Sequence, residues 1–535
     1  MSQERKDGAA VGLNRRGFMG AATLGAGAAA ATGFAGGAIA AAPAPAPQVD
    51  FPNTPGAFGA GGTFRAEVDI HDCEVEGRMP SDLAGVFYRV GPDPQYPKPG
   101  FEGDIPFDGE GHVSMFRIKD GHVDLRTRYV RNQRFKAQEK ARKSLWGMYR
   151  NPLTDDPSVK NLSNGTANTH LILHHDKLLV LKEDSPPVAM DPWTLETTDD
   201  YYTFGGKLKS KTFTAHPKLD PRSGNMIAFG YESKGFGTDD ISIFEIDPKG
   251  KVIWETSIKS PYVCMIHDFG VSDDHIAFLV IPLAINHAQM KAGGVHWAYD
   301  SALPSYFGVV RRGGDGKDVR WLKGPERMST HVMGSFGDGK RIYVDMDLGY
   351  SNQFPFFPNV HGEKFDPVKS AGRVARLSMD TSAKDLSTYD MEIKFEGHTG
   401  GLPRQDDRYN TQAYRYGFML GNDPTRAVDP RLGAQRPSNS WFKFDHQTGK
   451  VTSYFGGSDT GLQEMCFAPK SKDAPEGAGY LVGVANRLFE NRSDLLVVDA
   501  EKMELVSTVK LPFRIHGQIH GWWAREDQLP KVKRA

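Results

Sequence analysis

Cysteine is scarce in this chain of 535 residues. Its three cysteines, Cys73, Cys264 and Cys466, are too few and too scattered for a disulfide framework or a sulfur-ligated metal site. An excess of one charge sign is also missing, because 65 basic and 66 acidic residues give a formal net charge of −1. A nucleic-acid-binding protein should carry a basic surface. We therefore expect neither sulfur chemistry nor a nucleic-acid partner.

Long apolar runs are absent as well. Beyond the N-terminal region the longest apolar run is Ala277–Ala284, far short of the roughly 20 residues that span a bilayer. No stable membrane insertion is expected. With 39% hydrophobic and 11% aromatic residues, the chain can nevertheless bury a large core.

The N-terminus predicts a targeting segment. Arg15 and Arg16 precede Phe18 and an Ala/Gly-rich, weakly apolar stretch, which is typical of a twin-arginine (Tat) signal. The Tat export machinery is thus an expected partner before maturation, and the expected location is periplasmic or exported. The chain divides accordingly into a Tat-type signal at 1–40, an Ala/Pro linker at 41–56 and a single domain at 57–535.

Short β-type runs separated by turn residues dominate the rest of the sequence, which contains 59 Gly and 34 Pro. Residues 241–246 and 252–254 flank the turn Asp247-Pro-Lys-Gly250 and predict a hairpin. Two similar pairs follow the same pattern: 170–173 with 178–183, and 495–499 with 505–511. Many hairpins and few helical patterns predict an all-β fold, and we favour a β-propeller with long insertions although no strict repeat is present.

Two segments depart from this β pattern. Residues 134–146 form the clearest helical pattern. Residues 283–307, with Trp297, Tyr299 and Tyr306, are apolar and aromatic, and we expect them to cap a pocket.

Four histidines lie in separate short cassettes. They are Thr214-Ala-His216-Pro, Met265-Ile-His267-Asp-Phe, Thr330-His331-Val and Gln518-Ile-His520-Gly-Trp. No two are spaced as a helical i,i+4 pair, so a shared metal site must be assembled from four remote segments, as at the axis of a propeller or barrel. Since the chain has 17 histidines, spacing alone also allows each to be an ordinary core or surface residue.

The blocks taken together resemble the carotenoid cleavage oxygenase family over nearly the whole mature chain. The resemblance begins at Gly85-Val-Phe-Tyr-Arg-Val-Gly-Pro-Asp-Pro94 and Phe107-Asp-Gly-Glu-Gly-His112, and runs through the cassettes to Trp522. It implies a seven-bladed β-propeller with a helical and loop cap over an axial iron site.

The same resemblance implies a non-haem Fe(II) cofactor. Its four ligands would be His216, His267, His331 and His520. Four neutral imidazoles suit Fe(II) and leave open positions for O2. His516 also precedes a glycine and remains an alternative to His520, which the family pattern favours.

The resemblance also implies residues that surround and orient the four metal ligands. Glu183 and Glu464 match two of three glutamates that orient the ligands in the family, and Thr169 matches a threonine beside an open iron position. The block that would carry the third glutamate is Gly400-Gly-Leu-Pro-Arg404. We therefore expect that glutamate to be absent, or displaced to Glu396.

Within the family the chain looks most similar to the bacterial stilbene-cleaving branch, the lignostilbene dioxygenases. Phe107, Tyr149 and Lys182 match the positions that hold a para-hydroxylated ring there. A partly buried lysine beside a tyrosine hydroxyl can bind a phenol and favour its phenolate, which sends electron density to the alkene that reacts with O2 to give two aldehydes. Phe107 would stack on the ring. The alternative for Lys182 is a surface side chain lying over the cap.

Three other functions stay open at this point. Apocarotenoid cleavage needs no phenol activation, whereas cleavage of a 4-hydroxyphenylpropene such as isoeugenol needs the same lysine and tyrosine. A non-catalytic, ligand-binding propeller belongs to another class. A metal assay separates the last from an enzyme, and a 4-hydroxy and 4-methoxy substrate pair separates phenol-activated from polyene cleavage.

Overall fold

The computed structural model describes residues 63–101, 103–433 and 436–531. The predicted Tat signal at 1–40 and the linker at 41–56 lie outside the described residues. In the described part of the chain, no helix combines the length and apolar character needed to cross a membrane.

Antiparallel sheets make up seven blades, as the family resemblance implies. The first three blades are built from consecutive segments of the chain. The first blade contains β6 (His170–His174), β7 (Lys177–Leu181), β8 (Val188–Met190) and β9 (Thr197–Asp199). The second contains β10 (Lys218–Leu219), β11 (Met226–Tyr231), β12 (Asp240–Ile246) and β13 (Val252–Lys259). The third contains β14 (Phe269–Val271), β15 (His275–Val280), β18 (Tyr306–Arg311) and β19 (Arg320–Lys323).

The fourth and fifth blades join into one eight-stranded sheet, because β22 pairs with β24 at its edge. Their strands are β20 (Met328–Gly337), β21 (Arg341–Gly349), β22 (Gly372–Asp380) and β23 (Asp390–Ile393); and β24 (Thr399–Gln405), β25 (Tyr416–Gly421), β26 (Ser440–Asp445) and β27 (Val451–Phe455).

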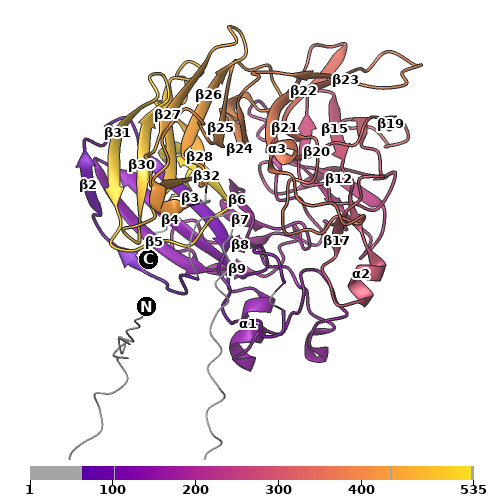
Figure 1. Ribbon diagram of the computed structural model, residues 1–535, viewed down its shortest axis with the longest axis horizontal. Helices are drawn as coiled ribbons and strands as arrows, with labels where there is room; N and C mark the ends of the chain where they lie inside the picture. The colour runs from indigo at the N-terminus through magenta and orange to yellow at the C-terminus, as the bar shows by residue number, and fades with distance from the viewer. Residues whose placement is uncertain (1–62, 102, 434–435, 532–535) are drawn as a thin grey trace, which may run out of the picture. The chain divides into compact units, whose positions relative to one another are not determined.

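The last two blades combine strands from both ends of the described chain. They are β28 (Thr460–Pro469), β29 (Gly479–Arg487), β30 (Arg492–Asp499) and β31 (Glu504–Lys510) with β2 (Glu74–Gly77); and β32 (His520–Arg525) with β3 (Gly85–Pro92), β4 (Gly111–Lys119), β5 (His122–Tyr129) and β1 (Asp69–Ile70). Figure 1 shows the indigo strands β3 to β5 beside the yellow strand β32. Pairing of early with late strands closes the propeller.

The hairpins predicted from the sequence are confirmed. The turn between β12 and β13 is closed by a bond from Gly250 N to Asp247 O of 2.9 Å, and Gly250 has a φ of 79° that favours glycine. The strands β6 with β7 and β30 with β31 form the other two pairs. The propeller core is formed by strand residues that are buried on both faces, as in β11 and β29.

The α-helices of the described chain lie in the connections between strands. The predicted helix is confirmed as α1 (Gln133–Ala141), although it ends at Arg142, whose left-handed backbone stops it before Trp146. The other short elements are α2 (His287–Lys291), α3 (Pro367–Ser370), the hairpin β16 (Leu283–Ile285) with β17 (Trp297–Tyr299), and the 3-10 turns η1 (Pro157–Val159), η2 (Asp407–Tyr409), η3 (Pro430–Leu432) and η4 (Glu526–Gln528).

The innermost strands of successive blades contact one another around the propeller axis, from β14 through β20, β24, β28 and β32 to β6. A residue at the start of such a strand therefore lies close to residues from several other blades. This arrangement is what can bring remote histidines into one site.

Candidate metal centre and substrate cavity

Four inner strands bring the four predicted histidines together. His216 and His267 lie just before β10 and β14, His331 lies in β20, and His520 is the first residue of β32. Their Nε2 atoms are 3.1 Å apart in each of the pairs His216–His267, His267–His331 and His331–His520. Together they form a group whose ligand atoms all lie within 4.8 Å of one another.

The outer nitrogen of three of these rings contacts an oxygen acceptor. Nδ1 of His267 lies against a carboxylate oxygen of Glu183, and Nδ1 of His520 is 2.8 Å from Oε1 of Glu464. Nδ1 of His331 is 2.9 Å from Oγ1 of Thr330. An acceptor at Nδ1 places the proton there and leaves Nε2 with a lone pair.

The donor set therefore fits a metal ion. Lone pairs that face each other at 3.1 Å cannot hydrogen-bond to one another, and a cation between them removes the repulsion. Burial lowers the pKa of His216 and His520 well below the usual range for imidazole, which keeps both rings in the neutral form that ligates metals. Burial also acts to lower the pKa of His267, but the charge of Glu183 outweighs it and raises that pKa.

Asp347, and not a third glutamate, is the acidic group beside His331. The hydroxyl of Thr330 donates to Oδ2 of Asp347 at 2.6 Å, and so accepts from the His331 ring. Oδ1 of Asp347 accepts the backbone N–H of His331 at 2.8 Å. Glu396 is exposed, so the proposed displacement to that residue is wrong. Asp347 lies on the adjacent strand β21, 16 residues after His331, where no motif in the sequence marks it.

The two histidines left as alternatives near the C-terminus are separated by the structure. His520 belongs to the four-histidine group, whereas His516 belongs to a different buried cluster with Asp93 and His112.

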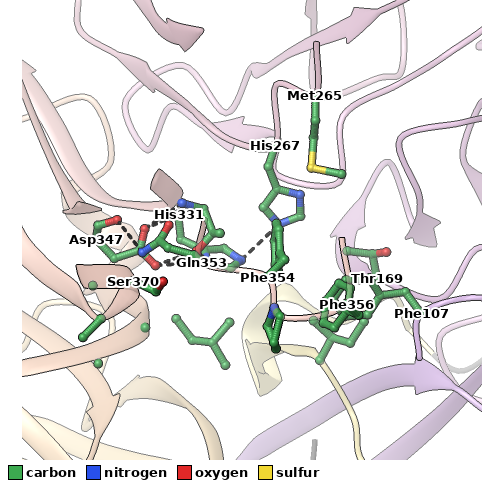
Figure 2. Close-up of a pocket in the computed structure, with 18 of the residues that line it drawn as sticks. Phe107, Thr169, Met265, His267, His331, Asp347, Gln353, Phe354, Phe356 and Ser370 are labelled. Atoms are coloured by element: carbon green, nitrogen blue, oxygen red, sulfur yellow. Dashed lines mark hydrogen bonds and ion pairs between the residues drawn. The ribbon is translucent and has the colours of Figure 1, made fainter. Parts of the chain in front are cut away.

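A cavity of about 390 Å³ adjoins the four histidines. His267 and His331 lie in its wall, together with Phe107, Tyr149 and Lys182. Glu183 and Thr169 line it too, so the cavity brings together the residues predicted for substrate binding and part of the metal centre. In Figure 2, Phe107, Thr169 and Phe356 lie on one side of His267, and Gln353 and Ser370 lie on the other.

The Lys182 ammonium lies between two aromatic rings. Its Nζ is 5.4 Å from the centroid of Tyr149 and 5.9 Å from that of Phe107. Lys182 is only 4% exposed, so the alternative that it is a surface side chain is wrong. Burial lowers its pKa, against the opposing charges of Asp184 and Glu183, and burial raises the pKa of Tyr149 well above the usual range.

Asn168 was not predicted from the sequence as a site residue, but it contacts two of the residues predicted to bind a phenol, Phe107 and Lys182. Its Nδ2 donates to the backbone oxygens of Phe107 at 2.6 Å and of Gly109 at 2.7 Å. Its Oδ1 accepts from Lys182 at 3.2 Å and from Thr169 at 3.0 Å. Only its position next to Thr169 could have drawn attention to it.

The aromatic segment 283–307, which was expected to cap a pocket, does not supply the aromatic wall of this cavity. Trp297 and Tyr299 are buried but do not line the cavity. Phe354 and Phe356 do, with ring centroids 5.9 and 4.8 Å from that of Phe107. The hairpin β16–β17 instead supports this wall from behind, since the N–H of Tyr299 donates to the carbonyl of Pro358 at 2.9 Å.

A seven-bladed propeller with a four-histidine centre beside an aromatic cavity defines a class of oxygenase, and comparison with known proteins agrees. The family model described as Retinal pigment epithelial membrane protein matches residues 62–525. The chain therefore belongs to this family, the carotenoid cleavage oxygenases, whose similar members are named as oxygenases.

Two curated relatives and one solved structure are similar over most of their length. Lignostilbene-alpha,beta-dioxygenase isozyme III of Sphingomonas paucimobilis is 42% identical over 90% of this chain and 99% of its own. Isoeugenol monooxygenase of Pseudomonas nitroreducens is 38% identical over 86% of this chain and 95% of its own. The crystal structure of Pseudomonas brassicacearum lignostilbene dioxygenase matches with a TM-score of 0.85 and 40% identity, over 89% of this chain and 100% of that one.

The role of the contact between Thr330 and His331 can be tested by substitution. Thr330→Val removes the hydroxyl that accepts from Nδ1 of His331, so the metal should dissociate about 10- to 100-fold more readily, as for other outer-shell losses. The measurement is the metal dissociation constant by competition with a coloured chelator. Thr330→Ser keeps the hydroxyl and should bind like the unmodified chain; equal affinity in both variants would show that the hydroxyl has no orienting role.

Proposed function

We propose that this chain is an Fe(II)-dependent dioxygenase that cleaves the central alkene of 4-hydroxystilbenes with O2 to give two aromatic aldehydes. The enzyme class follows from its family, and the substrate class follows from the cavity. The similar proteins named for lignostilbene support the same reading.

One observation carries the proposal: two neighbouring residues serve the two ends of one site. Lys182 lies between Tyr149 and Phe107, and the next residue, Glu183, contacts the ring of His267. A phenol held at Lys182 is therefore only a short distance from the metal centre. In a 4-hydroxystilbene the alkene is attached directly to the phenol ring, so a substrate bound in this way brings its double bond beside the histidines.

The phenol end can stabilise an anion. An ammonium group has three donors, and Asn168 Oδ1 is the acceptor that the structure gives Lys182. No carboxylate forms a salt bridge with Lys182 among the described residues. A substrate phenolate would pair with this buried charge and lower its desolvation cost, while Tyr149, whose pKa is raised, stays protonated and can donate to the same oxygen.

The four histidines would hold iron, which supplies O2 activation when bound. The chain contributes the geometry around it. Phe107 and Phe356 confine the phenol ring, the apolar wall excludes water, and Lys182 holds the phenolate oxygen so that electron density moves toward the alkene. Thr169 lies in the same wall.

Cleavage of a 4-hydroxyphenylpropene is a second candidate, because one similar protein is named isoeugenol monooxygenase and such a substrate could use the same lysine and tyrosine. Ser370 and Gly401 also line the cavity, and Figure 2 shows Ser370 on the opposite side of His267 from Phe107. A stilbene places its second ring in that space, whereas the short propenyl group does not reach it. The stilbene therefore fits the cavity better.

Removing the Lys182 charge tests the proposal. Lys182→Met keeps the length of the side chain, so the variant should retain its metal while kcat/KM for a 4-hydroxystilbene falls by about 100-fold or more. Turnover is followed by aldehyde formation and metal content by elemental analysis. Lys443→Met is the matched control, since Lys443 is another buried lysine, bonded to the carbonyl of Ala500. Unchanged turnover in Lys182→Met would contradict the phenolate role.

We further propose that the chain is exported by the Tat machinery. The twin arginine at 15–16 supports this assignment. Replacing both with lysine, as Arg15→Lys with Arg16→Lys, should leave the protein in the cytoplasm of a Tat-competent bacterium, while the unmodified chain reaches the periplasm. Cell fractionation and immunoblotting measure this. Equal export of both would mean that another route is used.

A further inference from the structure

A second cluster of buried ligating side chains lies where the propeller closes. Asp93 directly follows β3, His112 is the second residue of β4, and His516 lies in the connection that enters β32. Their exposed fractions are 0%, 0% and 4%. One ligand atom of each lies within 4.8 Å of the others. The substrate cavity does not include any of these residues.

The two histidines leave lone pairs without partners. Nε2 of His112 is 2.9 Å from the carbonyl oxygen of Ala66 and must donate to it. Its Nδ1 is therefore deprotonated, and this buried atom has no hydrogen-bond partner among the described residues. Neither ring nitrogen of His516 makes a well-formed hydrogen bond in that part of the chain, although the ring lies near the backbone of Gly91. Buried polar atoms without partners are costly, so a group that accepts these lone pairs would stabilise the fold.

Asp93 supplies a carboxylate to the same place. Its Oδ1 accepts the N–H of Phe64 at 2.9 Å, and its Oδ2 accepts the N–H of Arg65 at 2.7 Å and the hydroxyl of Tyr129 at 2.9 Å. Each carboxylate oxygen has about two acceptor positions, so Oδ1 retains one. These bonds hold the carboxylate in a fixed orientation, as they do for the outer partners of metal ligands.

Both rings are in the ligating form. Burial lowers the pKa of His516 to about 4, against the opposing charge of Asp93 and the nearby backbone of Gly91. Burial also lowers the pKa of His112, again against Asp93. Neutral imidazole is the species that binds a metal.

We propose that Asp93, His112 and His516 form a second metal site, distinct from the four-histidine centre. Two imidazole nitrogens and one carboxylate oxygen suit a divalent cation of the Zn²⁺ type. The bond from His112 to the Ala66 carbonyl repeats the usual arrangement in which a ligating histidine donates its other ring N–H to a backbone oxygen.

The position of the site gives it a structural role. It links the β3–β4 blade strands to the segment that enters β32, which is about 400 residues away along the chain. Through Asp93 and His112 it also holds residues 64–66. An ion that binds only the closed propeller stabilises it in proportion to its occupancy.

Zinc binding to a chain that lacks the first centre tests the proposal directly. In His267→Ala/His331→Ala, two of the four histidines are gone, so equilibrium dialysis against Zn²⁺ should still find about one ion per chain. The melting temperature of this variant should rise with Zn²⁺. Adding His516→Gln should remove both the bound ion and the rise. The unmodified chain should hold two ions.

His174→Gln is the matched control. His174 is buried and both its ring nitrogens also lack a partner among the described residues, but it does not belong to any group of three or more potential metal ligands in that part of the chain. Its loss should leave the Zn²⁺ content unchanged. Circular dichroism checks the folding of every variant, and His112→Gln replaces His516→Gln if the latter does not fold.

The outcomes separate the two sites. One ion in the unmodified chain and none in His267→Ala/His331→Ala would overturn the second site, and a buried water would then be the partner of His516. Loss of one ion in His267→Ala/His331→Ala, with a second ion lost only on adding His516→Gln, would support both sites. A single ion that only His516→Gln removes would support this site and contradict the first.

Discussion

The mutual approach of four imidazole nitrogens is the constraint on which the rest of this structure depends. Neighbouring Nε2 atoms at 3.1 Å have lone pairs that repel one another unless a cation lies between them. Three of the rings are held from outside: His267 and His520 by Glu183 and Glu464, which belong to other blades, and His331 by the Thr330–Asp347 pair of its own blade. His520 takes part only because β32 pairs with β3. Closure of the propeller and completion of the centre are therefore the same event.

The chemistry depends on a second constraint, the covalent link between Lys182 and Glu183. Both follow the end of β7, and their side chains diverge toward different partners. One contacts Asn168 beside two aromatic rings, and the other contacts His267 and the hydroxyl of Tyr231 at 2.8 Å. Arg150 in turn donates to that hydroxyl at 2.9 Å. One peptide unit thus separates the side chain that contacts Asn168 from the side chain that contacts His267, within a buried network of hydrogen bonds.

The hairpins could be predicted from the sequence because their turns are local, whereas the seven-bladed propeller and the set of four histidines were implied by the family resemblance, since spacing alone left each histidine open. The pairs around Asp247–Gly250 show this well. Asp347, Asn168 and Phe354 could not be predicted in the same way. Their roles arise from contacts between strands or loops that are remote in the chain, and a lone aspartate, asparagine or phenylalanine carries no local signal. The segment with Trp297 was expected to cap a pocket, but none of its residues lines the cavity, because an aromatic run indicates burial and does not reveal which surface it supports.

The central claim is that a phenol held at Lys182 activates an alkene held beside the four histidines. The most direct measurement is O2 uptake and aldehyde formation by the Fe(II)-reconstituted chain with a 4-hydroxystilbene and with its 4-methoxy analogue, which has the same shape but no ionisable hydroxyl. We predict cleavage of the hydroxy compound, with one O2 consumed for two aldehydes, and little or no cleavage of the methoxy compound. Equal cleavage of both would contradict the role assigned to Lys182 and Tyr149.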